Sequence, residues 1–305
     1  MEKIIITTGD PNGIGAEITM KALKALNLPK EKIAIISNKK ILNYYGKLDK
    51  NYEIIESPYN ENDIKAGQVT KEAGEFSFQS LKLACELKPK AIVTAPVAKN
   101  ALHLAGHNFN GQTEVLQHFL AHDNQLAEML FVANGFRVLL LTRHCALKEI
   151  TLTQDVVVTK IKNLVKTFQK QFGINNPKFA LCGFNPHSGE DGILGREEID
   201  ILIPAVQELQ NAGIDITMPL PADTLFVEAA KNYLKNTKDK YDCYIANYHD
   251  QGLIPIKTVA GENTVNMTIG LDIVRTSPGH GTAFDIAGKN IASPKGMIAA
   301  IKEVL

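Results

Sequence analysis

Strand-like and helical segments alternate along most of this 305-residue chain. The strand-like segments are short apolar runs, and stretches with helical periodicity separate them. Such alternation implies a mainly parallel sheet with helices on both faces. We therefore predict an α/β protein, with strands expected at 3–8, 32–37, 54–56 and 91–94 and helices at 16–26 and 71–87.

The alternation is interrupted in the middle of the chain. Two apolar runs between 129 and 141 are joined by Asn134-Gly135, the commonest two-residue hairpin signal. An antiparallel element here indicates the start of a second lobe, after which the alternation resumes. Further helices are expected at 154–172, at 196–212 and from Pro294, with strands before Cys182 and His249. The predicted lobes are 1–125 with 265–305, and 126–264.

Composition excludes several function classes. Lys plus Arg and Asp plus Glu both number 33, and the sequence pI is near 7.1, so the chain lacks the basic footprint of a protein that binds nucleic acid or an anionic membrane. No apolar run approaches the roughly 18 residues of a membrane span, and no signal peptide is evident. The four cysteines form no CxxC pair and lie in or beside apolar runs, which suits buried free thiols. We expect a cytoplasmic protein.

Three histidines each follow a strand-like run. They are His144, His187 and His249, and each is expected where a strand opens into a loop, which is where α/β sheets build their sites. Small, turn-forming residues flank two of them. The layout predicts a metal site assembled from distant segments, whereas His103/His107 and His118/His122 have helical spacing without a convincing carboxylate and are interpreted as exposed.

Glycine-rich segments lie near both ends of the chain. One is a strand-to-helix turn at 8–17, and the other is the loop 277–288. Glycines at such turns let backbone amides approach a phosphate, while a helix N-terminus adds partial positive charge. Either segment alone is more simply explained as a turn without a ligand.

Together these segments resemble the opening and closing motifs of the isocitrate and isopropylmalate dehydrogenase superfamily. The match is closer to one branch, the 4-hydroxythreonine-4-phosphate dehydrogenase family, and covers essentially the whole chain. The ordered motifs that carry it are 8–17, 94–99, 111–114, 185–190, 221–226, 249–252, Asn266, 275–277 and 280–282. The resemblance implies a two-lobe α/β/α fold with the active-site cleft between the lobes, the first lobe on the cofactor side and the second for metal, substrate and dimerisation.

The resemblance also implies a reaction. It is the oxidation of 4-phosphooxy-L-threonine by NAD or NADP, followed by decarboxylation to 3-amino-2-oxopropyl phosphate, in pyridoxine 5'-phosphate biosynthesis. The three histidines would bind one divalent metal in a site completed across a homodimer interface; zinc or cobalt suits imidazole ligands better than magnesium. Substrate contacts fall on Gln112, Thr113, Lys257, Asn266 and Arg275, and cofactor contacts on Gly13, Gly15, Gly281, Thr282 and Asp285.

Several alternatives stay open. The family usually has Gly-His-Thr-Glu where this chain has Gly111-Gln112-Thr113-Glu114, and glutamine does not titrate near neutral pH. A paralogue acting on D-threonate or D-erythronate 4-phosphate is therefore an alternative, and a phosphate acyltransferase or a non-catalytic metabolite-binding protein is a more distant one. Candidate general bases, unranked, are Asp223, Lys99 and Asp250, of which Asp250 could instead orient a ligand histidine.

Overall fold

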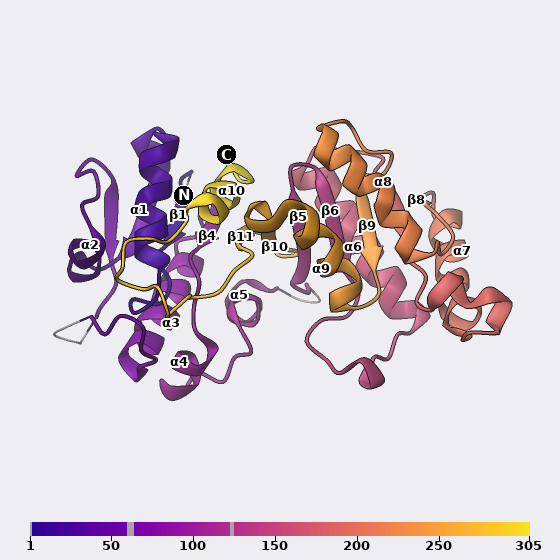
Figure 1. Ribbon diagram of the computed structural model, residues 1–305, viewed down its shortest axis with the longest axis horizontal. Helices are drawn as coiled ribbons and strands as arrows, with labels where there is room; N and C mark the ends of the chain where they lie inside the picture. Colours follow the sequence, from indigo (N-terminus) through magenta and orange to yellow (C-terminus); the bar gives the residue numbers. More distant parts are fainter. Residues whose placement is uncertain (1, 60–63, 123–124) are drawn as a thin grey trace. The chain divides into compact units, whose positions relative to one another are not determined.

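The computed structural model describes residues 2–59, 64–122 and 125–305. The chain divides into two compact units, residues 1–127 with 265–305 and residues 128–264. Both chain ends belong to the first unit (Figure 1). The roles assigned to the two lobes, and the cleft expected between them, stay predictions.

The first unit is built on a mostly parallel sheet. Its strands lie in the order β3-β2-β1-β4-β11-β10, in which only β10 runs antiparallel to its neighbour. The strands are β1 (Ile4–Thr7), β2 (Ile33–Ser37), β3 (Glu53–Glu56), β4 (Ala91–Thr94), β10 (Val265–Ile269) and β11 (Val274–Pro278). The four predicted strands of this unit are confirmed to within a residue or two.

Apolar side chains cover both faces of this sheet. On β1, Ile4 and Ile6 pack with helices α1 (Gly15–Leu26) and α10 (Lys295–Lys302) on one face. Ile5 lies in the core of the other face, which includes residues of α3 (Lys71–Glu86) and α5 (Gln112–Leu120). Strands buried on both faces read as continuous apolar runs, which explains the sequence pattern.

The strands of the second unit lie in the order β5-β6-β9-β7-β8. The predicted hairpin is confirmed, since β5 (Glu128–Ala133) and β6 (Phe136–Leu140) are antiparallel and joined by Asn134-Gly135, both with positive φ. The other pairs are parallel. The remaining strands are β7 (Lys178–Leu181), β8 (Asp215–Ile216) and β9 (Cys243–Ala246).

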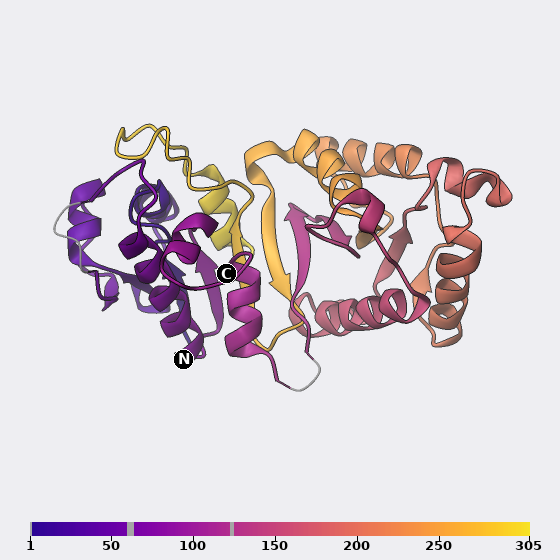
Figure 2. The same cartoon turned by 90° about the horizontal axis from the view of Figure 1, so that it is seen from below.

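Helices cover both faces of the strands of the second unit (Figure 2). One face packs against α8 (Ala222–Lys235) and α9 (His249–Ala260). On the other, α6 (Gln154–Gln171) places Phe168 against Phe179 of β7, with 5.4 Å between ring centroids. The helix expected at 196–212 is a π-helical turn, Glu198–Leu202, followed by α7 (Ile203–Asn211); Pro204 lacks the amide hydrogen that a continuous α-helix would need there.

Some elements were not expected from the sequence. They are α2 (Lys39–Tyr45), α4 (Lys99–Leu104), α5, α8, α9 and the strands β8, β10 and β11, besides the short 3₁₀ turns Lys30–Lys32, Leu147–Glu149 and Gly261–Asn263 and a left-handed turn within Pro186–Gly192. The expected loop at His249–Gly252 is wrong, because these residues form the first turn of α9. A side chain at Gly252 would lie 2.6 Å from Leu140 and 2.9 Å from Val138, so this glycine lets the helix pack on β6. In the part of the chain that the structure describes, no helix is long and apolar enough to cross a membrane.

Candidate functional site

Two of the three predicted metal ligands lie together in the second unit. His144 follows β6 and His249 follows β9, and these parallel neighbours end at the same edge of the sheet. The two ring centroids are 5.5 Å apart. Strand order therefore brings together two imidazoles that are more than a hundred residues apart in sequence.

A carboxylate orients one ring of this pair. His249 Nδ1 lies 2.7 Å from Asp250 Oδ1. Hydrogen bonding at Nδ1 leaves Nε2 as the nitrogen available to a ligand, an arrangement typical of metal-binding histidines. Asp250 is exposed and touches the ring, so its geometry favours the orienting role over the role of general base.

The third histidine lies in an unusual turn. His187 has φ 52° and ψ 29°, and left-handed backbone continues through Ser188, Gly189, Glu190 and Asp191. His187 is exposed, like His144. Among the residues that the structure describes, no three His, Cys, Asp or Glu side chains are grouped to hold a metal ion, so a single copy brings together a histidine pair and not a complete site.

Several side chains lie differently from what the sequence suggested. His103, His118 and His122 are exposed as expected, but the exposure predicted for His107 is wrong. Its ring stacks on Phe78 at 3.6 Å between centroids, and Nε2 lies 2.8 Å from a Glu75 carboxylate oxygen. Of the cysteines, Cys145 is exposed whereas the other three are buried.

The remaining charged candidates are at the surface. Lys257 is exposed, so the apolar residues before it in the sequence do not bury it. Lys99 begins α4 and Asp223 lies in the first turn of α8, and both are exposed. Lys257 remains a predicted substrate contact. Lys99 and Asp223 remain candidate bases, and their geometry does not favour one over the other.

Arg275, unlike these exposed residues, is buried, with only 3% of its surface exposed. It lies on β11, and its Nε and Nη2 donate to Thr94 Oγ1 at 2.8 and 2.6 Å. Nη1 lies 3.5 Å from Thr268 Oγ1. Across the described ranges no carboxylate forms an ion pair with it, and burial lowers its pKa to about 9 although the charge of Glu114 opposes that shift. A buried cation held only by hydroxyl groups is suited to receive an anion.

Other predicted substrate contacts lie close to this arginine in the same unit. Gln112 donates from Nε2 to the carbonyl of Ala95, the residue after Thr94, at 3.2 Å. Its Oε1 and the Oδ1 of Asn266 are buried and have no hydrogen-bond partner. Asn266 precedes Thr268 by two residues on β10 and so shares its face, and Thr113 is buried. The arrangement combines one cation with two acceptors that need donors.

The two glycine-rich ends contact each other in the first unit. Ile14 N donates to Thr282 O at 3.1 Å. A side chain at Gly13 would meet Thr282 at 3.0 Å, and one at Gly15 would meet Thr8 O at 2.1 Å. These glycines therefore allow close packing of protein on protein. The amides at 8, 10, 12, 13 and 14 all donate within the protein, so in this conformation they are not directed at a phosphate.

The closing loop is more open than the opening turn. A side chain added at Gly281 would meet no atom within 4 Å, and Gly281 and Asp285 are exposed. The predicted cofactor contacts in the closing loop therefore have open space beside them for a ligand, whereas Gly13 and Gly15 in the opening turn do not.

The opening turn contains a buried acid that the sequence reading did not single out. Asp10 is fully buried, its Oδ1 accepts from Asn12 N at 2.9 Å, and its Oδ2 has no partner. Burial raises the pKa of this carboxyl to about 6, although the amides of Asn12 and Ala98 oppose the shift.

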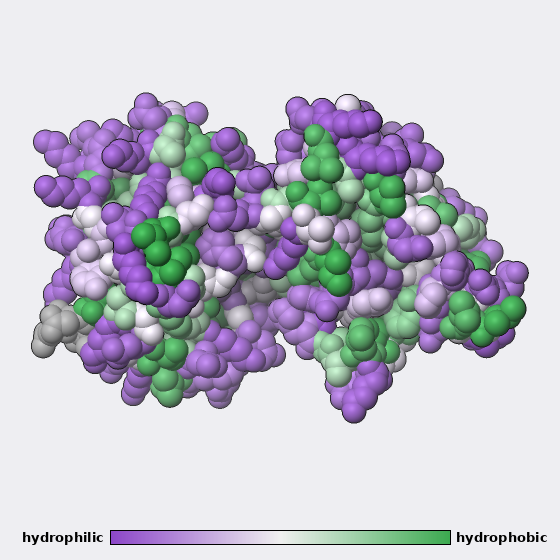
Figure 3. All heavy atoms as spheres, in the orientation of Figure 1, coloured by the Kyte–Doolittle hydropathy of each residue, from purple (hydrophilic) through white to green (hydrophobic). Residues whose placement is uncertain are grey.

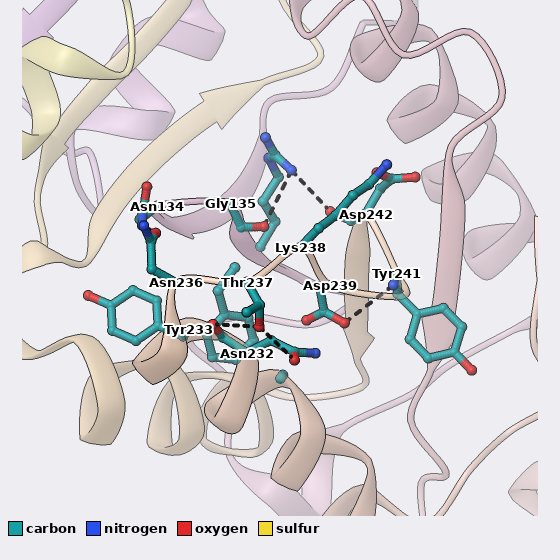
Figure 4. Close-up of a pocket in the computed structure, with 13 residues that line it drawn as sticks. Asn134, Gly135, Asn232, Tyr233, Asn236, Thr237, Lys238, Asp239, Tyr241 and Asp242 are labelled. Carbon is teal, nitrogen blue, oxygen red and sulfur yellow. Dashed lines mark hydrogen bonds between the residues drawn. The ribbon is translucent and has the colours of Figure 1, made fainter.

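The second unit contains a pocket that is lined in part by the Asn134-Gly135 turn (Figure 4). Arg137 there donates to the carbonyls of Gly135 and Asp242, each at 3.4 Å.

Comparison with known proteins decides the family. A family model described as "Pyridoxal phosphate biosynthetic protein PdxA" matches residues 2–304. The chain belongs to the PdxA family. It is therefore an oxidoreductase of the 4-hydroxythreonine-4-phosphate dehydrogenase family, a class of dehydrogenases that implies NAD or NADP. This contradicts the phosphate acyltransferase alternative.

PdxA-family relatives of different activity resemble the chain to a similar degree. A 4-hydroxythreonine-4-phosphate dehydrogenase of Synechocystis sp. is 40% identical, over 99% of this chain and 94% of the relative. A D-threonate 4-phosphate dehydrogenase of Salmonella typhimurium is 37% identical, over 98% and 97%. The crystal structure of the Klebsiella pneumoniae 4-hydroxythreonine-4-phosphate dehydrogenase matches with TM-score 0.85 and 33% identity, over 100% of this chain and 98% of that one.

The predicted fold class is confirmed by this match and by a more remote one. Isocitrate dehydrogenase from Methylococcus capsulatus superposes with TM-score 0.53 at 14% identity, covering 100% of this chain and 85% of that one. At that identity the likeness concerns the fold alone.

Proposed function

We propose that this PdxA-family dehydrogenase oxidises 4-phosphooxy-L-threonine with NAD or NADP to 2-amino-3-oxo-4-phosphooxybutanoate. Loss of carbon dioxide then gives 3-amino-2-oxopropyl phosphate, in pyridoxine 5'-phosphate biosynthesis. The observation that carries the proposal is the buried guanidinium of Arg275, which forms no ion pair with a carboxylate of the described residues. A substrate with a phosphate and a carboxylate supplies the anion that this cation lacks.

The polar atoms near Arg275 support the amino acid as substrate. Gln112 Oε1 and Asn266 Oδ1 are buried acceptors without donors. An ammonium group carries three N–H donors, whereas the hydroxyl of a hydroxy acid carries one. Two acceptors that need donors are satisfied more fully by the ammonium of 4-phosphooxy-L-threonine than by D-threonate 4-phosphate.

The histidines supply the proposed metal site. His144 and His249 are neighbours, and Asp250 fixes the nitrogen that His249 presents, so the pair fits a divalent metal such as zinc or cobalt. A bound metal would polarise the substrate's hydroxyl and carbonyl oxygens as a Lewis acid. Because one described copy groups only two of the three histidines, we propose that a homodimer completes the site with His187.

The closing loop is the proposed place for the nicotinamide cofactor. Gly281 has open space around it, and Thr282 and Asp285 offer a hydroxyl and a carboxylate. Gly13 and Gly15 would act indirectly, by allowing the opening turn to pack under that loop. Hydride leaves the substrate only as its hydroxyl loses a proton, and Lys99 and Asp223 remain the candidates that accept it.

A substrate panel tests the proposal. Reduction of NAD and of NADP is followed by nicotinamide absorbance with 4-phosphooxy-L-threonine, D-threonate 4-phosphate and D-erythronate 4-phosphate, with zinc, cobalt or magnesium present. We expect the highest kcat/KM with the amino acid phosphate. A higher kcat/KM with a hydroxy acid phosphate would contradict the proposal.

The second candidate, D-threonate 4-phosphate dehydrogenase, is favoured by one observation. Gln112 stands where the 4-hydroxythreonine-4-phosphate dehydrogenase family usually has histidine. The same panel separates the two candidates.

A further inference from the structure

Glu198 is a buried carboxylate in the second unit that the reaction outlined above does not use. It opens the π-helical turn Glu198–Leu202 and is 2% exposed. Within the described ranges it forms no ion pair, although a buried carboxylate is costly unless it is paired or hydrogen-bonded. Its stabilisation must come from uncharged donors.

The donors come from the segment that leads to His187. Glu198 Oε1 accepts from Phe184 N at 2.7 Å and Asn185 N at 2.8 Å. Oε2 accepts from Asn185 Nδ2 at 2.9 Å. Both oxygens are thus bonded to residues two and three positions before the histidine. A carboxylate suits this set because it is acceptor-only, whereas a glutamine would place its own N–H₂ near a donor.

The turn that follows is left-handed over five consecutive residues. Four of them, His187, Ser188, Glu190 and Asp191, are not glycine and have φ between 43° and 54°. Left-handed helical backbone is unfavourable for L-residues and persists where its surroundings determine it. The hydrogen bonds before the turn provide one such constraint.

Glu198 also contacts the middle of the turn. A side chain at Gly189 would lie 2.7 Å from Glu198 Oε2, so the absence of a Cβ at Gly189 lets the backbone approach the carboxylate. A side chain at Gly195 would likewise lie 2.4 Å from the Asn185 side chain. The glutamate therefore bonds to the residues that enter the turn and lies close to the backbone at its centre.

We infer that Glu198 is a positioning residue that keeps residues 187–191 left-handed and thereby sets the direction of the His187 imidazole. The inference rests on the proposed function in one respect, the role of His187 as a metal ligand. The effect of Glu198 on the conformation of 187–191 does not require a metal, and it is measured separately on the metal-free protein.

The test compares Glu198→Gln with Glu197→Gln, the same change one residue away. The Glu197 carboxylate accepts from the Asn185 side chain at 2.6 Å and from the amides of Arg196 and Glu197. No amide of 184–192 is among its donors in the described residues, so the backbone there should be unaffected. Hydrogen–deuterium exchange is measured on the full-length, metal-free protein. We expect the peptide covering 184–192 to exchange about ten- to hundred-fold faster in Glu198→Gln, since charge-assisted hydrogen bonds are lost, and as in the parent in Glu197→Gln.

A cobalt spectrum provides the second readout. Cobalt is added to the parent, Glu198→Gln, Glu197→Gln and His187→Ala, and the visible absorption of the bound metal is compared. We expect Glu198→Gln to resemble His187→Ala, while Glu197→Gln resembles the parent. A purely structural role would lower the melting temperature without giving the spectrum of a lost ligand.

The outcomes separate the two ideas. Parent-like exchange at 184–192 in Glu198→Gln overturns the positioning role, whatever cobalt does. If the parent binds no cobalt, the proposed metal site fails and the exchange result alone decides whether Glu198 holds the turn. Should Glu198→Gln not fold, Glu198→Asp retains the charge one methylene short, and faster exchange confined to 184–192 supports the role, while unchanged exchange contradicts it.

Discussion

The polar site of the first unit and the histidine site of the second differ in how complete one chain makes them. Arg275 is buried and held by two hydrogen bonds to Thr94. His144 and His187 are exposed, and only His144 and His249 lie together. The comparison teaches that the proposed anion site, made from neighbouring strands, has its cation fixed by the fold, whereas the proposed metal site, made from residues beyond the strand ends, needs a further constraint.

Exposed apolar residues follow the left-handed turn of the second unit. Ile193 is 81% exposed and Leu194 44%, and Figure 3 shows apolar side chains gathered on the visible face of this unit. Such residues beside an incomplete site agree with the proposed homodimer, in which a second copy would cover them.

The largest effect is expected from the histidine pair. Replacing His249 or His144 by Ala should lower kcat/KM by about a thousand-fold or more, because the Lewis acid contributes several kcal/mol. Metal content, measured on the purified protein, should fall with it while circular dichroism is unchanged. His118→Ala, an exposed histidine on α5, is the control, and full metal occupancy in the His249 and His144 variants would contradict the site.

Arg275→Met should separate binding from stability. Removing the cation is expected to cost about 2–5 kcal/mol of binding free energy for a phosphorylated substrate. The protein without substrate should become more stable, since a buried charge without an ion-pair partner is replaced by an apolar chain. Calorimetric titration and thermal unfolding measure the two changes.

Arg137→Met in the second unit is the matched control. Arg137 stacks over Phe172 at 4.6 Å and donates to two carbonyls, so its loss should destabilise the protein and leave substrate affinity unchanged. A destabilised Arg275→Met would show that this cation is part of the structure and not of an anion site.

The pH dependence of the free energy of unfolding tests whether Asp10 is a second buried charge in the first unit at neutral pH. The folded pKa is about 6, above the reference value of 3.8, so the folded state binds more protons than the unfolded state between these values. Stability should therefore fall by up to about 3 kcal/mol as pH rises from 4 to 6, and then level off. Urea unfolding of the parent and Asp10→Asn at several pH values measures this, and parallel curves would disprove it.

Gln112→His has the smallest expected effect. A gained or lost hydrogen bond to a charged substrate changes kcat/KM by about ten- to hundred-fold, and an imidazole that becomes cationic should disfavour the ammonium substrate relative to the hydroxy acids. Cofactor affinity should stay constant. Identical kinetics on every substrate would make Gln112 irrelevant to specificity.

The sequence predicts what depends on periodicity. The buried strands, the hairpin at Asn134-Gly135 and the convergence of His144 with His249 follow from local patterns and strand ends. The left-handed turn at His187 does not, because the residues before it are bonded to Glu198, more than ten residues further along the chain, and no local spacing indicates that contact.

Glycines also show that the sequence does not reveal contacts between distant segments. The sequence associates Gly13 and Gly15 with a phosphate, but in the structure both are required by neighbouring protein atoms. Composition cannot distinguish a close approach to a ligand from a close approach to another backbone segment. Apolar residues precede both Arg275 and Lys257, but only Arg275 is buried, so this pattern alone does not distinguish a buried cation from an exposed one.

The way the first unit is closed affects how a ribosome-bound chain can fold. In its sheet β4 lies between β1 and β11, and β11 ends at Pro278. Until that residue has been translated, β4 presents an open edge while the whole of 128–264 has already been made. The strands synthesised first therefore wait longest for their neighbour, and an unpaired strand edge of this kind can pair with other chains until 274–278 have been made.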